Sequence, residues 1–387
     1  MNSRLLVIVV CLLLSAVLCC SRALAEVAGL MRGTPKIQSI SELAFGPEGV
    51  LFVGDARGGA VFALDLGDTK PRGTSDPVNM QDVEARIAAR LGTKASEIMV
   101  HDLAVNPISQ NVYLSVSRGR GKWTQDYQLP NHVADADVLV RIPADGDGEK
   151  IDVVSLANVR YARKEIPDPI GAEKMHPWLK GISRRTDSIS DMAYADGTLY
   201  VAGLSNEEFA STMWTMPFPF RSDVTATTLE IYHGSHGQFE TEAPIRAFLP
   251  YELDGRSELL AAYLCTPLVV FETADLQNGK HIKGRTVGEF GFGNYPLDMV
   301  VYRKDGKDKL LIANSNLPFM IVDPKDLAAY HGSITTPVEG YLAGVPYEPR
   351  SGTGILQMDK LNDKFILALR RLPAGDLNLQ SLPVDRF

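Results

Sequence analysis

The chain has 387 residues, of which 45% are hydrophobic and 22% are charged, and it contains 33 Gly, 23 Pro and 4 Cys. This ordinary globular composition excludes an intrinsically disordered chain, a collagen-like chain and a small disulfide-stabilised scaffold. The formal net charge of −8 argues against nucleic acid or an anionic membrane surface as the main partner.

The N-terminus has the features of a secretory signal peptide over residues 1–25. Arg4 precedes the apolar run 5–18, and Ala23-Leu24-Ala25 offers a small-residue cleavage site. We expect residues 26–387 to form a single domain that is periplasmic or secreted. No later segment approaches the roughly 18 consecutive apolar residues that a membrane-spanning helix needs.

Cysteine usage supports the same compartment. Cys11, Cys19 and Cys20 lie within the predicted signal peptide, where lipid attachment at Cys19 or Cys20 is the less favoured alternative to cleavage. Cys265 alone remains, so no internal disulfide is expected, and we predict that it is a small buried hydrophobe. The sequence has no Cys-x-x-Cys-His haem motif and no P-loop, so neither haem nor a nucleotide is expected as cofactor.

A short phrase recurs along the chain. Its first copy is the run 39–45, followed by a Gly/Pro turn and the apolar run 50–53. Each copy predicts a strand, a Gly/Asp/Asn turn and a second strand. Five further copies begin at 100–105, 188–194, 244–248, 296–301 and 355–358. Third strands are expected at 60–64, 138–142, 268–271 and 319–322, and candidate fourth strands at 151–154 and 229–232.

Four short antiparallel strands, repeated about six times, indicate an all-β fold of the β-propeller type. We predict six blades, with loop and short-helix insertions. Seven blades is the alternative, because the chain between Asp102 and Asp191 is long enough to contain another. A strand from residues 27–38 is expected to complete the last blade and close the ring.

Three insertions interrupt the repeats. Residues 79–91 have the apolar spacing of a helix that ends at Gly92. Residues 158–186 are expected to form a loop, which is basic over 158–185. The aromatic and proline-rich segment 213–220 is expected to be a loop packed on the outside of a blade, with a lid or a partner surface as the alternative.

The repeat places a polar side chain at one equivalent position in five copies. Because the first strand of each propeller blade lines the central channel, these side chains are expected to converge at one mouth. Buried carboxylates must be paired, protonated or bound to a cation, and Ca²⁺ is the cation that such oxygen ligands favour. The alternatives are hydrogen bonds to backbone amides between blades, and direct acid–base chemistry. The five residues are Glu42, Asp102, Asp191, Arg246 and Asp298.

The segments 41–45, 48–55 and 296–299 resemble repeats of six-bladed NHL and SMP-30/gluconolactonase-like propellers. The chain is also similar to exported propellers of unassigned function. The first resemblance implies a divalent cation over the channel, where lactones or other esters are hydrolysed. Carried over by position, the implied metal ligands are Glu42, Asp191 and Asp298. Asp102 or His101 would activate water, and Arg246 would help to bind the ligand.

Two histidines form a second candidate site. His233 and His236 lie three residues apart in a Gly-rich turn, so both could reach one Zn²⁺ or Cu²⁺ ion. A third ligand must come from elsewhere, and His101, Glu240 and Glu242 are the candidates. The simpler alternative is that both histidines bond to the backbone of the turn.

These observations leave three functional hypotheses. The leading hypothesis is an exported propeller that binds an unidentified small molecule or protein. The alternative is a divalent-metal-dependent hydrolase at the channel mouth. A weaker alternative is a metal-binding redox partner that uses His233 and His236.

Overall fold

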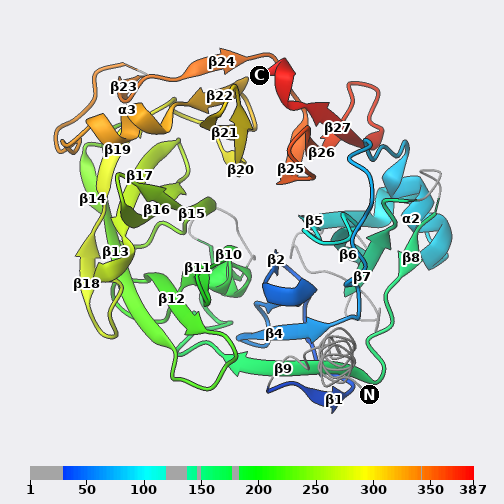
Figure 1. The fold of residues 1–387 in the computed structure, drawn as a ribbon. Coiled ribbons are helices and arrows are strands. Elements are labelled where there is room, and N and C mark those ends of the chain that lie inside the picture. The colour runs from blue at the N-terminus through cyan, green and yellow to red at the C-terminus, as the bar shows by residue number, and fades with distance from the viewer. Residues whose placement is uncertain (1–28, 119–136, 146–149, 177–182, 341) are drawn as a thin grey trace, which may run out of the picture.

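The computed structural model describes residues 29–118, 137–145, 150–176, 183–340 and 342–387. These residues form six antiparallel sheets around a central channel (Figure 1), which confirms the predicted six-bladed β-propeller. The predicted signal peptide and the basic run 118–122 lie outside the described residues, apart from Arg118. The innermost strands are β2 (Leu43–Phe45), β5 (Ile98–Val105), β10 (Asp191–Ala195), β15 (Ala247–Leu253), β20 (Pro296–Lys304) and β25 (Ile355–Lys360).

Each blade is named here by its innermost strand. The β2 blade adds β3 (Leu51–Asp55), β4 (Ala60–Asp65), β9 (Val159–Glu165) and β1 (Met31–Gly33). The β5 blade adds β6 (Val112–Arg118), β7 (Asp137–Ile142) and β8 (Asp152–Val153). The β10 blade adds β11 (Thr198–Leu204), β12 (Ser211–Pro217), β13 (Thr225–His233) and β14 (Gln238–Glu240), and β18 (His281–Lys283) pairs with β13.

The remaining three blades follow in chain order. The β15 blade adds β16 (Arg256–Ala262), β17 (Pro267–Glu272), β19 (Arg285–Glu289) and β23 (Ala343–Gly344). The β20 blade adds β21 (Lys307–Asn314), β22 (Phe319–Val322) and β24 (Glu348–Arg350). The β25 blade adds β26 (Phe365–Arg371) and β27 (Leu377–Pro383). The α-helices of the described chain are α2 (Val83–Leu91), within the predicted segment 79–91, and α3 (Pro324–Ala329).

The order of the blades in space differs from their order in the chain. Around the ring the blades run β5, β2, β10, β15, β20 and β25, so the first two are exchanged (Figure 1). After β8 the chain crosses back along residues 154–158 and adds β9 to the outer edge of the β2 blade. Only then does the chain proceed to the β10 blade on the other side.

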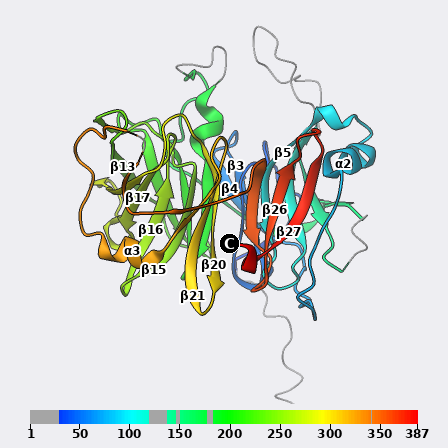
Figure 2. The ribbon, with the colours of Figure 1, turned by 90° about the horizontal axis from the view of Figure 1, so that it is seen from above.

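Apolar packing confirms this order. Six buried clusters lie between adjacent blades, and each of them draws its side chains from two neighbouring sheets. Trp214 on β12 and Phe52 on β3, for example, belong to the cluster between the β10 and β2 blades. Edge-on views of the ring show the sheets standing side by side (Figure 2). No helix among the described residues is both long and apolar enough to cross a membrane.

The ring closes differently from the prediction. The segment 27–38 contributes β1, which pairs with β9 in the β2 blade rather than with the last blade. The last blade instead gains residues 78–80, because Met80 and Leu379 exchange backbone hydrogen bonds of 2.9 and 2.8 Å. Helix α2 follows directly and joins the β5 blade to the β25 blade.

Two predicted loops are strands. The segment 158–186 contains β9, whose basic residues lie on the outer part of a sheet, where alternation with buried apolar residues is weak. The segment 213–220 begins within β12, and Trp214 there is fully buried. Phe218 and Phe220 just beyond the strand pack against the ring of Phe52. This segment therefore fills a blade interface and is neither a lid nor a free loop.

An ion pair secures the closing segment. Arg371 on β26 donates two hydrogen bonds to Glu84 on α2, at 2.9 and 2.7 Å, and only 11% of the Glu84 side chain is exposed. We expect Glu84→Gln to lower the free energy of unfolding by about 1–3 kcal/mol, because a charge-assisted, two-point bond is lost. Urea unfolding monitored by circular dichroism measures this change.

The matched control is the exposed pair Lys360–Asp363, in which 90% of the Asp363 side chain is exposed. Asp363→Asn should change the free energy of unfolding by less than about 0.5 kcal/mol. Equal effects of the two substitutions would show that the Glu84–Arg371 pair does not secure the closure.

Candidate functional site

Four aspartates on the inner strands connect neighbouring blades. Each carboxylate accepts a hydrogen bond from the amide of the next residue in its own strand, and a second from an amide in the adjacent blade. We call Asp102, Asp191, Asp298 and Asp359 the bridging aspartates. Their acceptor distances to the adjacent blade are 2.7 Å from Leu43 N, 2.6 Å from Phe248 N, 2.5 Å from Met358 N and 2.7 Å from Val105 N, respectively.

The bridging aspartates join four of the six blade interfaces. The two other interfaces lie between the β2 and β10 blades and between the β15 and β20 blades. Glu42 occupies the equivalent position in the β2 blade, where it accepts no hydrogen bond from the described residues, and Arg246 occupies it in the β15 blade. Arg246 lies 3.6 Å from Asp187 Oδ1. Three of the five polar residues singled out from the repeat are therefore interblade bonds, which was the simpler alternative.

The channel acids influence one another electrostatically. Burial raises the pKa of Glu42 well above its usual value, and the nearby Asp102, Asp191 and Asp298 raise it further, whereas Arg246 lowers it. Burial likewise raises the pKa of Asp102 to about 7, against the opposing effect of its amide donors. The acids thus gather around the channel as predicted from the repeat. Within the described residues, however, no three of their oxygens come within 4.8 Å of one another. A cation at Glu42, Asp191 and Asp298 stays a prediction.

His101 faces away from this group. Its Nε2 contacts the hydroxyl of Ser117, which donates to Asp137 Oδ1 at 2.8 Å. Burial lowers the pKa of His101. A role in activating water with Asp102 stays a prediction, and His101 lies in a different blade from His233 and His236.

The structure does assemble the second candidate site, with a ligand that the sequence analysis missed. His233 ends β13, His236 lies in the turn before β14, and Cys265 lies in the turn between β16 and β17. One ligand atom of each residue lies within 4.8 Å of the other two, the only such group of three among the described residues. We call these three residues the thiol–imidazole cluster. His233 and Cys265 are buried, whereas 37% of the His236 side chain is exposed.

Glu240 orients both imidazoles. Its carboxylate oxygens lie 3.1 Å from His233 Nδ1 and 2.6 Å from His236 Nδ1. Burial alone would raise the pKa of Glu240, but the two histidines outweigh it and lower the pKa to about 2. Of the three expected third ligands, Glu240 therefore contacts the ring nitrogens themselves, Glu242 pairs with Arg184, and His101 is remote.

The turn that carries the histidines is held tightly. Glu289 accepts a hydrogen bond from Gly234 N at 2.5 Å and another from the Ser235 hydroxyl at 3.0 Å. A Cβ added at Gly234 would come within 2.7 Å of a Val338 side-chain atom, so glycine is required there. The buried ring nitrogens of His233 nevertheless lack a well-aligned hydrogen bond within the described chain.

The turn that carries the thiol is strained. Cys265 and Thr266 have φ values of +62° and +61°, a region that residues with a Cβ rarely occupy. The amide of Cys265 donates to Asn294 O at 2.9 Å, and the hydroxyl of Thr266 donates to Gly291 O at 3.1 Å. These bonds hold the thiol beside His233, and strain of this kind clusters at functional sites.

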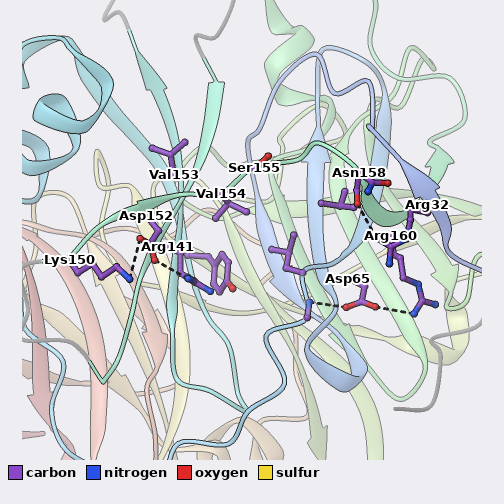
Figure 3. Close-up of a pocket in the computed structure, with 14 residues that line it drawn as sticks. Arg32, Asp65, Arg141, Lys150, Asp152, Val153, Val154, Ser155, Asn158 and Arg160 are labelled. Carbon is purple, nitrogen blue, oxygen red and sulfur yellow. Dashed lines mark hydrogen bonds and ion pairs between the residues drawn. The ribbon is translucent and has the colours of Figure 1, made fainter. Parts of the chain in front are cut away.

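A cavity of about 730 Å³ forms a third feature, between the outer strands of the β5 and β2 blades. The chain segment that crosses from β8 to β9 lines it, together with charged side chains from both blades (Figure 3). We call it the crossover cavity. The sequence analysis did not anticipate it, because it exists only where the two blades are exchanged.

Comparisons with known proteins define the class but not a family. No family model matches the chain, and no curated protein matches it. Many solved structures share the propeller architecture at low identity. A chain of the mitotic checkpoint complex is 8% identical with a TM-score of 0.34, and the alignment covers 94% of each chain. Hydrazine synthase of Kuenenia stuttgartiensis is 13% identical with a TM-score of 0.37, over 94% of this chain and 100% of that one.

A third similar structure is the extracellular region of plexin A4, which is 9% identical with a TM-score of 0.36, over 92% of this chain and 51% of that one. The molecule is a six-bladed β-propeller by its own sheet topology. The NHL or SMP-30 family suggested by the repeat phrase is not confirmed. Because one fold serves many functions, function must be argued from the sites.

The bridging aspartates predict a specific pH dependence of stability. Burial raises the pKa of Asp102 to about 7 and that of Asp359 to about 6, from an ordinary value of 3.8. The folded protein therefore binds more protons than the unfolded chain, and the free energy of unfolding should fall as the pH rises from about 4 to about 7. Urea unfolding at pH steps across this window measures the slope.

Asp359→Asn should reduce this slope near pH 6, whereas Asp363→Asn should leave it unchanged. Carboxyls with lowered pKa values, such as Asp323 and Glu240 at about 2, change the stability only below this window. A free energy of unfolding that rises from pH 4 to pH 7 would show that the bridging carboxylates are stabilised as ions.

Proposed function

We propose that this β-propeller binds one copper or zinc ion through His233, His236 and Cys265, and that its function depends on the ion. The observation that carries the proposal is the convergence of one thiol and two imidazoles, from two blades, within 4.8 Å. Thiolate and imidazole are the ligands that these two metals prefer in proteins.

The surroundings of the cluster support metal binding. Because Glu240 takes the Nδ1 atoms of both histidines, their Nε2 atoms remain to bind an ion. A carboxylate behind a histidine ligand is the usual outer partner in metal sites, where it sets the tautomer and the ring orientation. The buried nitrogens of His233, which lack a well-aligned hydrogen bond, would gain a partner in the ion.

A set of two imidazoles and one thiolate favours copper and electron transfer. When bound, copper would supply a one-electron redox couple, whereas zinc would supply a Lewis acid. The protein's own contribution is to hold the ligands on two rigid sheets and to leave the His236 edge exposed. That edge lies beside Phe292, which is 62% exposed, so a redox partner or an external ligand would approach there.

A second candidate function is a divalent-metal-dependent hydrolase of lactones or other esters at the channel mouth. One observation favours it: Glu42 faces three buried aspartates without a hydrogen bond from the described residues. Here Glu42, Asp191 and Asp298 would hold Ca²⁺, which would polarise an ester carbonyl.

Elemental analysis of protein purified without chelators or a histidine tag tests the first proposal. We expect about one equivalent of copper or zinc per chain, and its loss in Cys265→Ser and in His236→Gln. Glu240→Gln should weaken metal affinity by about 10–100-fold, since the orienting carboxylate is lost. His281→Gln is the control: it removes a histidine bonded to Glu230, away from the cluster, and should retain the ion.

Folding of each variant is checked by circular dichroism. A folded wild-type protein that takes up neither metal when titrated with it would overturn the proposal. Metal content unchanged by Cys265→Ser would overturn the assignment of the ligands.

The same measurement tests the hydrolase. About one equivalent of calcium, lost in Glu42→Gln, is the expected result if the channel acids hold a cation. Glu42→Gln is preferred to Asp298→Asn, because Asp298 also bonds two blades together and its loss would disturb the fold. A folded protein that binds no calcium in an equilibrium titration would remove this candidate.

A further inference from the structure

We propose that the crossover cavity binds a small molecule with two separated anionic groups. The cavity lies on the opposite pair of exchanged blades and shares no residue with the thiol–imidazole cluster, so the proposal is independent of metal binding. Its volume of about 730 Å³ falls within the range of small-molecule sites. Figure 3 shows charged side chains gathered at two ends, with apolar side chains between them.

The first end has two cations and one acid. Arg141 on β7 lies 2.9 Å from Asp152 Oδ2, and Lys150 lies 3.6 Å from Asp152 Oδ1. The Nε atom of Arg141 is buried and has no hydrogen-bond partner within the described chain. Asp152 neutralises one of the two cations, so this end keeps an excess of one positive charge.

The second end has the same composition. Arg160 on β9 lies 3.4 Å from Asp65 Oδ2, and the other Asp65 oxygen accepts a hydrogen bond from Gly67 N. Arg32 on β1 is exposed, and its guanidinium donates to the backbone oxygen of Asn158 at 3.2 Å. This end also keeps an excess of one positive charge.

The middle of the cavity separates the two ends. Val153 and Val154 of the crossing segment lie between them, together with Ser155 (Figure 3). A ligand with an apolar linker between two anionic groups would match this pattern. The local excess of two positive charges stands in a protein whose net charge is −8, so charge complementarity would favour dianions over monoanions at this place.

The ends come from elements far apart in the chain. Arg32, Arg141 and Arg160 are brought together only because β9 returns to the β2 blade after the β5 blade is complete. The crossing segment between β8 and β9 forms one wall of the cavity. The exchange of blades therefore builds the site.

Isothermal titration calorimetry with defined probes tests the proposal. The probes are the α,ω-dicarboxylates succinate, glutarate and adipate, with acetate as the monoanion and inorganic pyrophosphate as a compact polyanion. We expect saturable binding of at least one dicarboxylate, at least about tenfold tighter than acetate and tighter than pyrophosphate.

Single substitutions at the two ends supply the decisive comparison. Arg32→Gln and Lys150→Gln change exposed side chains, so the fold should be retained, and each should weaken binding of the dicarboxylate by about 5–10-fold. Each should also reduce the preference for dicarboxylate over acetate. Lys325→Gln, which changes an exposed cation on α3, is the control and should leave binding unchanged.

Three results would overturn the proposal. The first is an absence of saturable binding by every dicarboxylate. The second is equal affinity for acetate and the dicarboxylates. The third is a loss caused by only one of the two substitutions, which would show a site for a single anion. Pyrophosphate binding tighter than every dicarboxylate would replace the separated dianion with a compact phosphate group.

Discussion

Closure of the ring rests on carboxylates that accept hydrogen bonds from two blades at once. The bridging aspartates sit where six strands converge, and there is little room for side-chain packing near the axis. Apolar clusters hold the wider parts of adjacent sheets together, whereas the aspartates fix the innermost strands. Their burial raises their pKa values, yet the amides of neighbouring strands offer them hydrogen bonds that water would otherwise supply. The same constraint leaves Glu42 as the channel acid without such a bond.

This rigid ring determines what the sites can do. The thiol–imidazole cluster takes its ligands from turns on the β10 and β15 blades, and those blades are joined through the Asp191 bridge. Fixed sheets hold the two turns in register, so the strained conformation at Cys265 and Thr266 can persist. Glu240 and Glu289 then set the rings and the backbone of the histidine turn. A site of this kind depends on the scaffold for its geometry, which suits a centre that binds without large movement.

The sequence analysis anticipated the repeat because each inner strand carries the same local phrase, with a turn and an apolar partner strand. It failed where local pattern and tertiary position are unrelated. The strand β9 is basic and lies at an outer sheet position, so its residues have no alternation to distinguish them from a loop. Trp214 appeared to belong to a proline-rich loop, although it fills a blade interface.

The candidate site was predictable only in part. His233 and His236 were found because they are three residues apart, within one turn. Cys265 is separated from them by a whole strand pair, and nothing in its own neighbourhood distinguishes a ligand from a buried hydrophobe. A solitary cysteine in an exported chain was the available signal. The function of the aspartates in bonding the blades was named as an alternative, and the hydrogen bonds now assign it to Asp102, Asp191 and Asp298.

The exchange of the first two blades also bears on how the protein folds. The β2 sheet cannot be completed until β9 is available, and β9 follows the whole β5 blade in the chain. Residues 29–165 therefore form an interlocked pair of blades, in which neither sheet is finished before the other. The β10, β15, β20 and β25 blades can assemble largely in succession, apart from single strands exchanged between neighbours. Non-local pairing of this kind slows folding, so assembly of the interlocked pair sets the pace at which a closed ring can appear.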